Sequence, residues 1–276
     1  MKEAAPRVCV LRMEGTNMSH EMAVAAEACG FSAETVHIKQ LEGRCEQHLL
    51  RHLMDYEMLI IPGGFSAGDY VRAGAIFASR LRAMGRELTS FIDDGRLVLG
   101  VCNGFQVLVE LGLLPQGGEK GEFFPRAALA TNLSARYECR PAFMKNINRG
   151  KCIFTSLLTH GQIVSMPTAH AEGRFLLPPE KSASWIAKLE EEDQMVFSYC
   201  TPDGKEGVYP WNPSGTTRGI AALTNDTGTV LGMMPHPERA FWRIQSYDWT
   251  SRGSPEERAD GSLLFEAAFR YLSSHF

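Results

Sequence analysis

One short segment constrains the fold and the chemistry of this chain more than any other. Residues 98–112 read VLGVCNGFQVLVELG, so that Cys102 stands where an expected strand meets an expected helix. Such a corner exposes its central side chain at the carboxyl edge of a sheet, and the glycines at 100 and 104 let neighbouring backbone approach closely. The free N–H groups at the start of the helix favour a thiolate. Cys102 is therefore either a nucleophile or an inert buried thiol in an ordinary turn.

The first part of the chain repeats this order of strand and helix. Apolar runs predict strands at residues 8–11, 35–38, 58–61 and 97–101, and helical patterns are expected at 19–29, near 47–54, at 73–94 and at 105–111. Short buried strands joined by helices are typical of a parallel sheet. We therefore expect an α/β fold with a mostly parallel central sheet and helices on both faces.

The pattern changes beyond residue 117. Short strands are expected, for example at 136–139 and 195–199, and Pro, Gly and Asn separate them. This spacing favours antiparallel strands added to the same core in the second half. Neither an internal repeat nor a low-complexity linker divides the sequence, so we expect residues 1–276 to form a single domain.

Composition argues against several classes of function. The 276 residues carry a formal net charge of −4 without a basic block, so nucleic acid is not an expected partner. The apolar runs are too short for a bilayer, and residues 1–8 do not read as a signal peptide, which predicts a cytoplasmic protein without membrane association. The seven cysteines contain no C-x-x-C pair, and His48 and His52, on one face of the expected 47–54 helix, lack the glutamate of a zinc motif. We expect no metal site.

A nucleophilic cysteine needs a base and a group that orients the base. His236 follows the expected strand 230–234, stands between two prolines and precedes Glu238 by two residues. A loop at this strand end can carry His236 to the sheet edge that presents Cys102. Glu238 would then fix the tautomer that accepts the thiol proton. Taken alone, the stretch also fits a surface histidine–glutamate pair.

Several longer motifs carry a family resemblance. GVCNGFQ and MPHPE resemble the class I, or triad, glutamine amidotransferases, for which a flavodoxin-like fold is expected. Other motifs are similar to those of the glutaminase subunits of phosphoribosylformylglycinamidine synthases: PGGFSAGDYVRAGAI, NLSARYECR, AHAEGRF, YPWNPSGT and VLGMMPHPERAF, in this order between residues 14 and 241. Several long motifs in the same order identify a family far more specifically than one short motif.

The resemblance implies a role for each matching residue. Cys102 would attack the side-chain amide of L-glutamine, His236 would deliver the proton to the departing ammonia, and Glu238 would orient His236. The backbone N–H groups of Gly64 and Asn103 would stabilise the tetrahedral oxyanion. The products of this reaction are glutamate and ammonia, formed through a cysteine thioester.

Further assignments rest on the same resemblance. The side chain of Gln106 would contact the substrate glutamine. His170, Glu172 and Arg174 are expected in a loop, either as a surface salt-bridge cluster or at the active-site mouth or a partner interface. Residues 242–261 look longer than the family's usual link to the final helix, expected at 262–272. This link is either a solvated insertion or a docking surface.

The resemblance also implies a division of labour. The chain has no P-loop, so we expect no cofactor in it and expect ATP and Mg²⁺ to be used by a partner synthetase subunit, assisted by a small accessory subunit. The synthetase would convert formylglycinamide ribonucleotide to formylglycinamidine ribonucleotide in de novo purine biosynthesis. Two readings stay open beside this one: the glutaminase of another amidotransferase, and a noncatalytic binding or regulatory module on the same fold.

Overall fold

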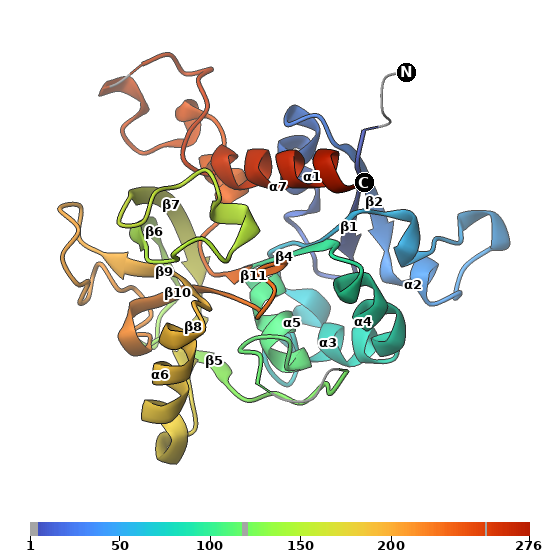
Figure 1. Ribbon diagram of the computed structural model, residues 1–276, viewed down its shortest axis with the longest axis horizontal. Helices are drawn as coiled ribbons and strands as arrows, with labels where there is room; N and C mark the ends of the chain where they lie inside the picture. Colours follow the sequence, from blue (N-terminus) through green and yellow to red (C-terminus); the bar gives the residue numbers. More distant parts are fainter. Residues whose placement is uncertain (1–4, 118–120, 252) are drawn as a thin grey trace.

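The computed structural model describes residues 5–117, 121–251 and 253–276, and a nine-stranded mixed sheet forms the centre of this part of the chain (Figure 1). Its strand order is β2-β1-β3-β4-β11-β10-β9-β6-β7. The first five strands in this order run parallel: β2 (Ser32–His37), β1 (Arg7–Arg12), β3 (Met58–Ile61), β4 (Leu97–Val101) and β11 (Val230–Met233). Every residue of β3, β4 and β11 is buried, as expected for parallel strands that are covered on both faces.

Antiparallel strands of the second half extend the same sheet, as predicted, although the sequence indicated only two of them, at 136–139 and 195–199. They are β10 (Ile220–Thr224), β9 (Met195–Cys200), β6 (Glu138–Asn146) and β7 (Ile163–His170). A separate antiparallel pair, β5 (Ala128–Thr131) with β8 (Glu172–Leu176), was not among the sequence predictions. The mostly parallel central sheet with added antiparallel strands is thus confirmed.

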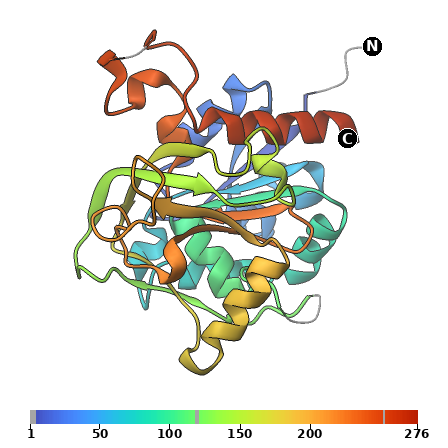
Figure 2. The same ribbon diagram turned by 60° about the vertical axis from the view of Figure 1, so that its left-hand side comes forward.

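Helices cover both faces of the sheet, as predicted. Helices α1 (Ser19–Ala28) and α7 (Ser262–His275) lie on one face, and α3 (Ala75–Arg82), α4 (Gly85–Asp93) and α5 (Asn103–Leu111) lie on the other (Figures 1 and 2). Helix α6 (Ser182–Glu191) lies beside the antiparallel strands, and α2 (Ile38–Leu41) is a single turn. All of α5 is buried, because its residues are enclosed by the parallel strands and by α3.

The expected helix at 47–54 is wrong. Two short 3₁₀ turns, Gln47–Leu49 and Leu53–Asp55, stand there, and the backbone between them is extended. Leu53 is the only buried residue of the two turns, so this stretch lacks the apolar face that would hold a helix against the core. His48 and His52 consequently do not share a helix face.

Two other boundaries differ from prediction. The expected helix 73–94 is divided into α3 and α4, and the strand expected at 136–139 begins only at Glu138. The preceding residues form a turn in which Ala135 has a φ of 54° and donates its N–H to Asn132 O. No helix in the described ranges is long and apolar enough to cross a bilayer.

The described residues of 242–261, which exclude residue 252, fold back on themselves and onto the sheet. The guanidinium of Arg258 lies 4.4 Å from the ring centre of Phe241 and 4.3 Å from that of Trp242. Asp260 Oδ2 accepts the N–H of Ser165 in the edge strand β7, at 2.7 Å. This contact occupies part of an edge that could otherwise pair with another strand.

Candidate active site

Cys102 lies at the corner between β4 and α5, in a backbone conformation that residues other than glycine rarely adopt. Its φ is 53° and its ψ is −106°, and its N–H donates to Met233 O at 2.8 Å. The helix that follows packs so closely that a Cβ on Gly104 would lie 1.9 Å from Ile61 O. Such strain persists only where the surroundings enforce it, and it is typical of reactive sites. The strand-to-helix corner therefore has the geometry expected from the sequence.

His236 reaches the same sheet edge, because β11 pairs in parallel with β4 and ends beside it. His236 Nδ1 lies 2.6 Å from Glu238 Oε1, and both side chains are buried. The His236 N–H donates to Pro167 O at 2.8 Å. The other ring nitrogen, Nε2, is buried and makes no hydrogen bond of ordinary geometry to a described residue, although the Cys102 sulfur is close enough to interact with the imidazole. Glu238 thus fixes one ring nitrogen, and the other is free for proton transfer.

The electrostatics of His236 favour its charged form. Burial alone lowers the pKa of the imidazole, but the Glu238 carboxylate and the nearby Cys102 sulfur outweigh burial and raise the pKa. Gly63 touches both reactive side chains: a Cβ there would lie 2.8 Å from His236 Cε1 and 3.4 Å from Cys102 Cβ. The thiol, the imidazole and the carboxylate therefore occupy one buried site.

Gly64 and Asn103 border this site from two loops. Gly64 follows Gly63, and Asn103 is the first residue of α5, so its N–H has no partner within the helix. Asn103 Oδ1 accepts the N–H of Ser66 at 3.4 Å, which ties the loop after β3 to the start of α5. The loop that contains Gly64 and the helix start at Asn103 are thus joined beside Cys102.

Gln106 is buried, and both ends of its amide are already bonded. Its Nε2 donates to Glu172 O at 2.6 Å, and its Oε1 accepts from Asn103 Nδ2 at 2.9 Å. A contact with a substrate would have to share or replace one of these bonds.

The expectation of a loop at His170, Glu172 and Arg174 is wrong, because His170 ends β7 and the other two residues lie in β8. The alternative of a surface salt-bridge cluster is wrong for His170, which is 2% exposed. Burial and the charge of His236 lower the pKa of His170 to about 3. Glu172 Oε2 accepts the N–H of Ala73 at 3.2 Å. No contact in the described part of the chain joins Arg174 to the thiol, the imidazole or Gln106.

Three backbone carbonyls of the 167–172 segment contact the site. Pro167 O accepts from His236, Glu172 O accepts from Gln106, and Ala169 O accepts the thiol hydrogen of Cys102 at 3.5 Å. The sequence analysis missed these contacts, because backbone atoms are common to all residue types. Only the AHAEGRF motif marked this segment as characteristic.

Asp69 is a further residue that the sequence analysis did not single out, although it lies in the motif FSAGDY. Its Oδ1 lies 3.3 Å from Asn103 Nδ2. Burial and the negative charge of Glu172 raise the pKa of Asp69 to about 6. A half-buried carboxylate of weakened acidity therefore borders the site.

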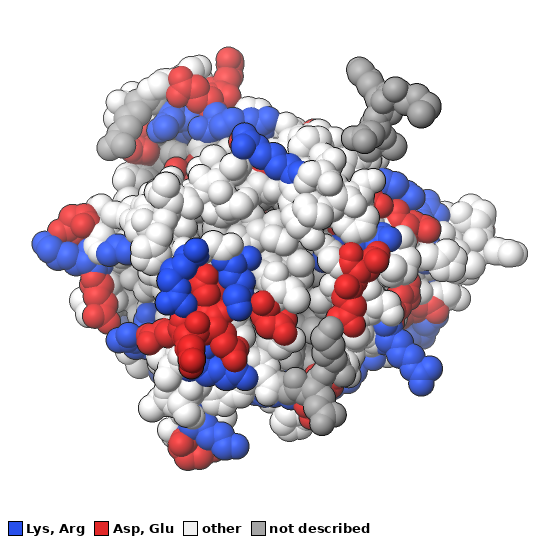
Figure 3. Space-filling view, viewed as in Figure 1, with Lys and Arg blue, Asp and Glu red and all other residues white. Residues whose placement is uncertain are grey.

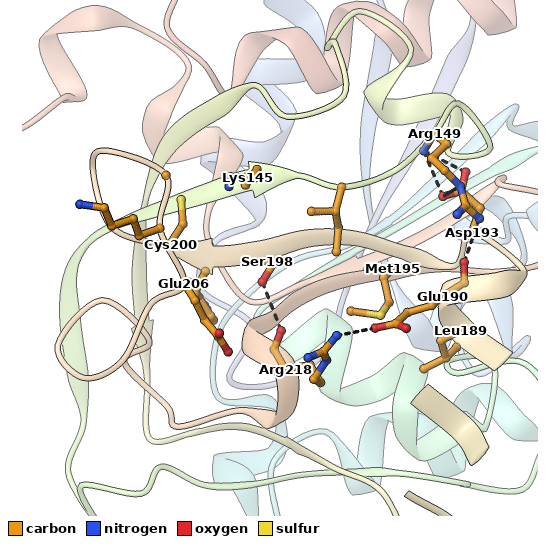
Figure 4. A pocket seen from close by; sticks show the side chains of 14 residues that line it. Lys145, Arg149, Leu189, Glu190, Asp193, Met195, Ser198, Cys200, Glu206 and Arg218 are labelled. Carbon is orange, nitrogen blue, oxygen red and sulfur yellow. Dashed lines mark hydrogen bonds and ion pairs between the residues drawn. The ribbon is translucent and has the colours of Figure 1, made fainter. Parts of the chain in front are cut away.

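A separate pocket of about 470 Å³ lies between α6 and the strands β9 and β6, and none of the predicted site residues lines it (Figure 4). Two ion pairs lie among its lining residues, Arg218 with Glu190 at 2.9 Å and Arg149 with Asp193 at 3.5 Å. Acidic and basic side chains are interspersed on this face of the molecule (Figure 3). Among the described residues, no group of three or more His, Cys, Asp or Glu side chains is placed to hold a metal ion.

A buried thiol, imidazole and carboxylate in this arrangement can carry out nucleophilic acyl transfer. Comparison with known proteins narrows the chemistry further. Residues 5–272 match the family model of the CobB/CobQ-like glutamine amidotransferase domain. The phosphoribosylformylglycinamidine synthase subunit PurQ of Archaeoglobus fulgidus is 45% identical over 272 residues, which are 96% of this chain and 97% of that one. The chain belongs to the PurQ family of glutamine amidotransferases.

Two more comparisons agree with PurQ membership. The PurQ subunit of Picrophilus torridus is 40% identical over 263 residues, with 95% of this chain and 97% of that chain covered. A chain in the structure of PurLQS from Thermotoga maritima superposes with a TM-score of 0.72 at 28% identity, covering 98% of this chain and all of that chain. The PurQ likeness therefore extends over almost the whole sequence and includes its second half.

Proposed function

We propose that this chain is the glutaminase subunit of phosphoribosylformylglycinamidine synthase and supplies ammonia for de novo purine biosynthesis. Membership of the PurQ family over almost the whole chain carries this proposal. The buried group of Cys102, His236 and Glu238 supports it chemically. The family membership argues against the glutaminase of another amidotransferase. The triad argues against a noncatalytic module, which would not need it.

In the first half of the reaction, Cys102 is the nucleophile. Its proton passes to His236 Nε2, and Sγ then bonds to the side-chain amide carbon of L-glutamine. Glu238 holds the Nδ1 hydrogen and stabilises the imidazolium that forms. The raised pKa of His236 favours this charge distribution.

The second half releases both products. The tetrahedral oxyanion accepts hydrogen bonds from the N–H groups of Gly64 and Asn103. The imidazolium of His236 protonates the leaving nitrogen, the carbon–nitrogen bond breaks, and ammonia departs from a glutamyl thioester on Cys102. His236 then removes a proton from water, whose oxygen attacks the thioester carbon. Glutamate leaves and the thiol is restored.

In this proposal the side chain of Gln106 binds the substrate glutamine. Its amide Nε2 then donates hydrogen bonds both to the substrate and to the Glu172 carbonyl. His170, Glu172 and Arg174 belong to the mouth of the site or to a partner interface. The bond from Gln106 to the Glu172 carbonyl supports a place at the mouth for Glu172. His170 is 2% exposed, which argues against a contact between its side chain and a partner. For Arg174 the support is the shared motif alone.

The partner in this proposal is an ATP-dependent synthetase subunit, with a small accessory subunit, in the cytoplasm. The resemblance to a chain of PurLQS supports such an assembly. ATP and Mg²⁺ are used by the synthetase, and ammonia reaches it by a sheltered path, because in neutral water ammonia is mostly protonated and not nucleophilic. A family match over residues 5–272 supports a single domain, and exposed Ile244, Tyr247 and Trp249 support a docking surface at 242–261.

Replacement of the nucleophile tests the proposal. With the synthetase, the accessory subunit, ATP, Mg²⁺ and formylglycinamide ribonucleotide present, the unsubstituted chain should form glutamate from glutamine, and Cys102→Ser should abolish this activity without unfolding the protein. Amination driven by added ammonium salt should survive in the variant, because the synthetase site is untouched. Glutamate formation by Cys102→Ser at the unsubstituted rate would contradict the assignment.

A further inference from the structure

Asn132, in the turn after β5, is tied to the turn between β7 and β8 by four hydrogen bonds. Its N–H donates to Ala171 O at 2.8 Å, and its Nδ2 donates to His170 O at 2.8 Å. Its Oδ1 accepts the N–H of Gly173 at 3.0 Å and lies 3.1 Å from His170 Nδ1. Asn132 is 2% exposed, so water does not compete for these bonds.

The imidazole of His170 is part of this arrangement. Because Asn132 Oδ1 can only accept, we assign a hydrogen to His170 Nδ1. Asn132 also donates Nδ2 to Arg136 O at 2.9 Å, which fixes the orientation of its amide. The neutral state agrees with the lowered pKa of His170. His170 therefore acts as a hydrogen-bond donor within the protein, and its ring makes no described contact with the thiol.

Asn132 and His170 hold the end of β7 and the start of β8, and carbonyls of this segment contact the site. On one side of His170, Ala169 O accepts from Cys102 Sγ and Pro167 O accepts from the N–H of His236. On the other side, Glu172 O accepts from Gln106 Nε2. A shift of residues 167–172 would therefore move three carbonyl groups that contact Cys102, His236 and Gln106.

We propose that Asn132 and His170 form a positioning pair for the glutaminase reaction. The pair holds residues 167–172 in the place where their carbonyls align Cys102 and His236. This inference rests on the proposed function. Misplacement of reacting groups by about 1 Å can cost a factor of about 100 in rate, so a positioning pair that contacts no reacting atom has a kinetic effect.

Two substitutions of His170 and one control separate positioning from mere stability. His170→Asn keeps an N–H donor near the place of Nδ1, whereas His170→Leu removes the donor and keeps an apolar side chain of similar bulk. Asn148→Ala is the control: Asn148 is also 2% exposed, and its Oδ1 accepts from the N–H groups of Gly150 and Cys152. Asn148 lies beyond the end of β6 that is opposite to the end paired with His170.

Steady-state glutamine hydrolysis is measured in the complex with the synthetase, together with the melting temperature of each variant. We expect His170→Leu to lower kcat about tenfold or more with a smaller change in KM, and His170→Asn to recover most of the loss. Asn148→Ala should lower the melting temperature and leave kcat unchanged. If His170→Leu fails to fold, Asn132→Asp, which replaces the Nδ2 donor with a second acceptor oxygen and adds a buried negative charge, should show the same kcat loss.

The inference is overturned if folded His170→Leu keeps the kcat of the unsubstituted chain; folded Asn132→Asp serves this purpose if His170→Leu does not fold. It is also overturned if kcat follows the melting temperature across all variants, including the control Asn148→Ala. An unsubstituted chain without glutaminase activity would instead contradict the proposed function, so the two failures are distinguishable.

Discussion

The backbone carbonyl of Ala169 accepts the thiol hydrogen of Cys102 at 3.5 Å, although 67 residues separate the two in the chain. A carbonyl oxygen stabilises a thiol and repels a thiolate. Ala169 therefore competes with His236 Nε2 for the same proton. Transfer of the thiol proton to His236 therefore requires the bond to Ala169 O to be given up.

This competition predicts that glutamine hydrolysis is coupled to the partner. We expect weak glutaminase activity in the isolated chain, because the arrangement that transfers the proton to His236 is scarcely populated. Glutamate formation should rise strongly when the synthetase, ATP and formylglycinamide ribonucleotide are added. Steady-state glutamate assays with and without these components measure the effect. Full activity in the isolated chain, with no response to the synthetase, would argue against coupling.

Removal of the Glu238 charge should act mainly on the transition state. In Glu238→Gln the imidazolium of His236 loses its counter-charge, so we expect kcat to fall about 100-fold or more with a smaller change in KM. Glu42→Gln is the control, because Glu42 also pairs closely with a cation, Arg80 at 2.5 Å, but lies away from the site. An unchanged kcat in Glu238→Gln would leave Glu238 with a structural role only.

A single methyl group should disturb the contact between base and nucleophile. In Gly63→Ala the new Cβ would lie 2.8 Å from His236 Cε1, so the ring must move and kcat/KM should fall about tenfold or more. Gly161→Ala is the comparison, because its φ of 86° makes it strained while nothing lies within 4 Å of the added carbon. Equal activity of the two variants would show that Gly63 does not set the position of the ring.

Asp69 should make the folded protein less stable as pH rises, which is the opposite of the usual effect of a carboxylate whose pKa is lowered by folding. Its pKa of about 6 in the folded protein lies above the ordinary 3.8, so between these values the folded state binds the proton more tightly than the unfolded state does. The contribution of Asp69 to the free energy of unfolding therefore falls as pH rises from about 4 to about 6. Asp69→Asn should remove this fall and be more stable than the unsubstituted chain above pH 6. Urea unfolding of both proteins at several pH values tests this, and parallel pH curves would contradict it.

The parallel half of the fold was predictable because its information is local. Apolar runs that alternate with helical patterns indicated β1, β2, β3 and β4, and the apolar run before His236 indicated β11. The glycines around Cys102 indicated a sharp corner. The sequence indicated that a loop after strand 230–234 can carry His236 to the edge that presents Cys102, and the parallel pairing of β11 with β4 places it there. The helix predicted at 47–54 is absent because a helical pattern without a buried face does not produce a helix.

The missed parts depend on contacts between distant segments. Asn132 and His170 are 38 residues apart, and the pairing of β5 with β8 brings them together. The sequence of β8 shows little alternation of apolar and polar residues, because Gly173 takes the place of an apolar side chain. The carbonyls of Pro167 and Ala169 act through backbone atoms, which residue types do not reveal.

Covalent trapping tests the central claim most directly. The complex is incubated with a chloroketone analogue of glutamine, with and without excess glutamine, and the modified cysteine is identified by peptide mass spectrometry. Non-specific alkylation should favour Cys139, which is exposed, over Cys102, which is 6% exposed. We predict a label on Cys102 alone, formed more slowly in the presence of glutamine. A label on Cys139 with Cys102 unmodified, or a label on Cys102 that glutamine does not slow, would contradict the account.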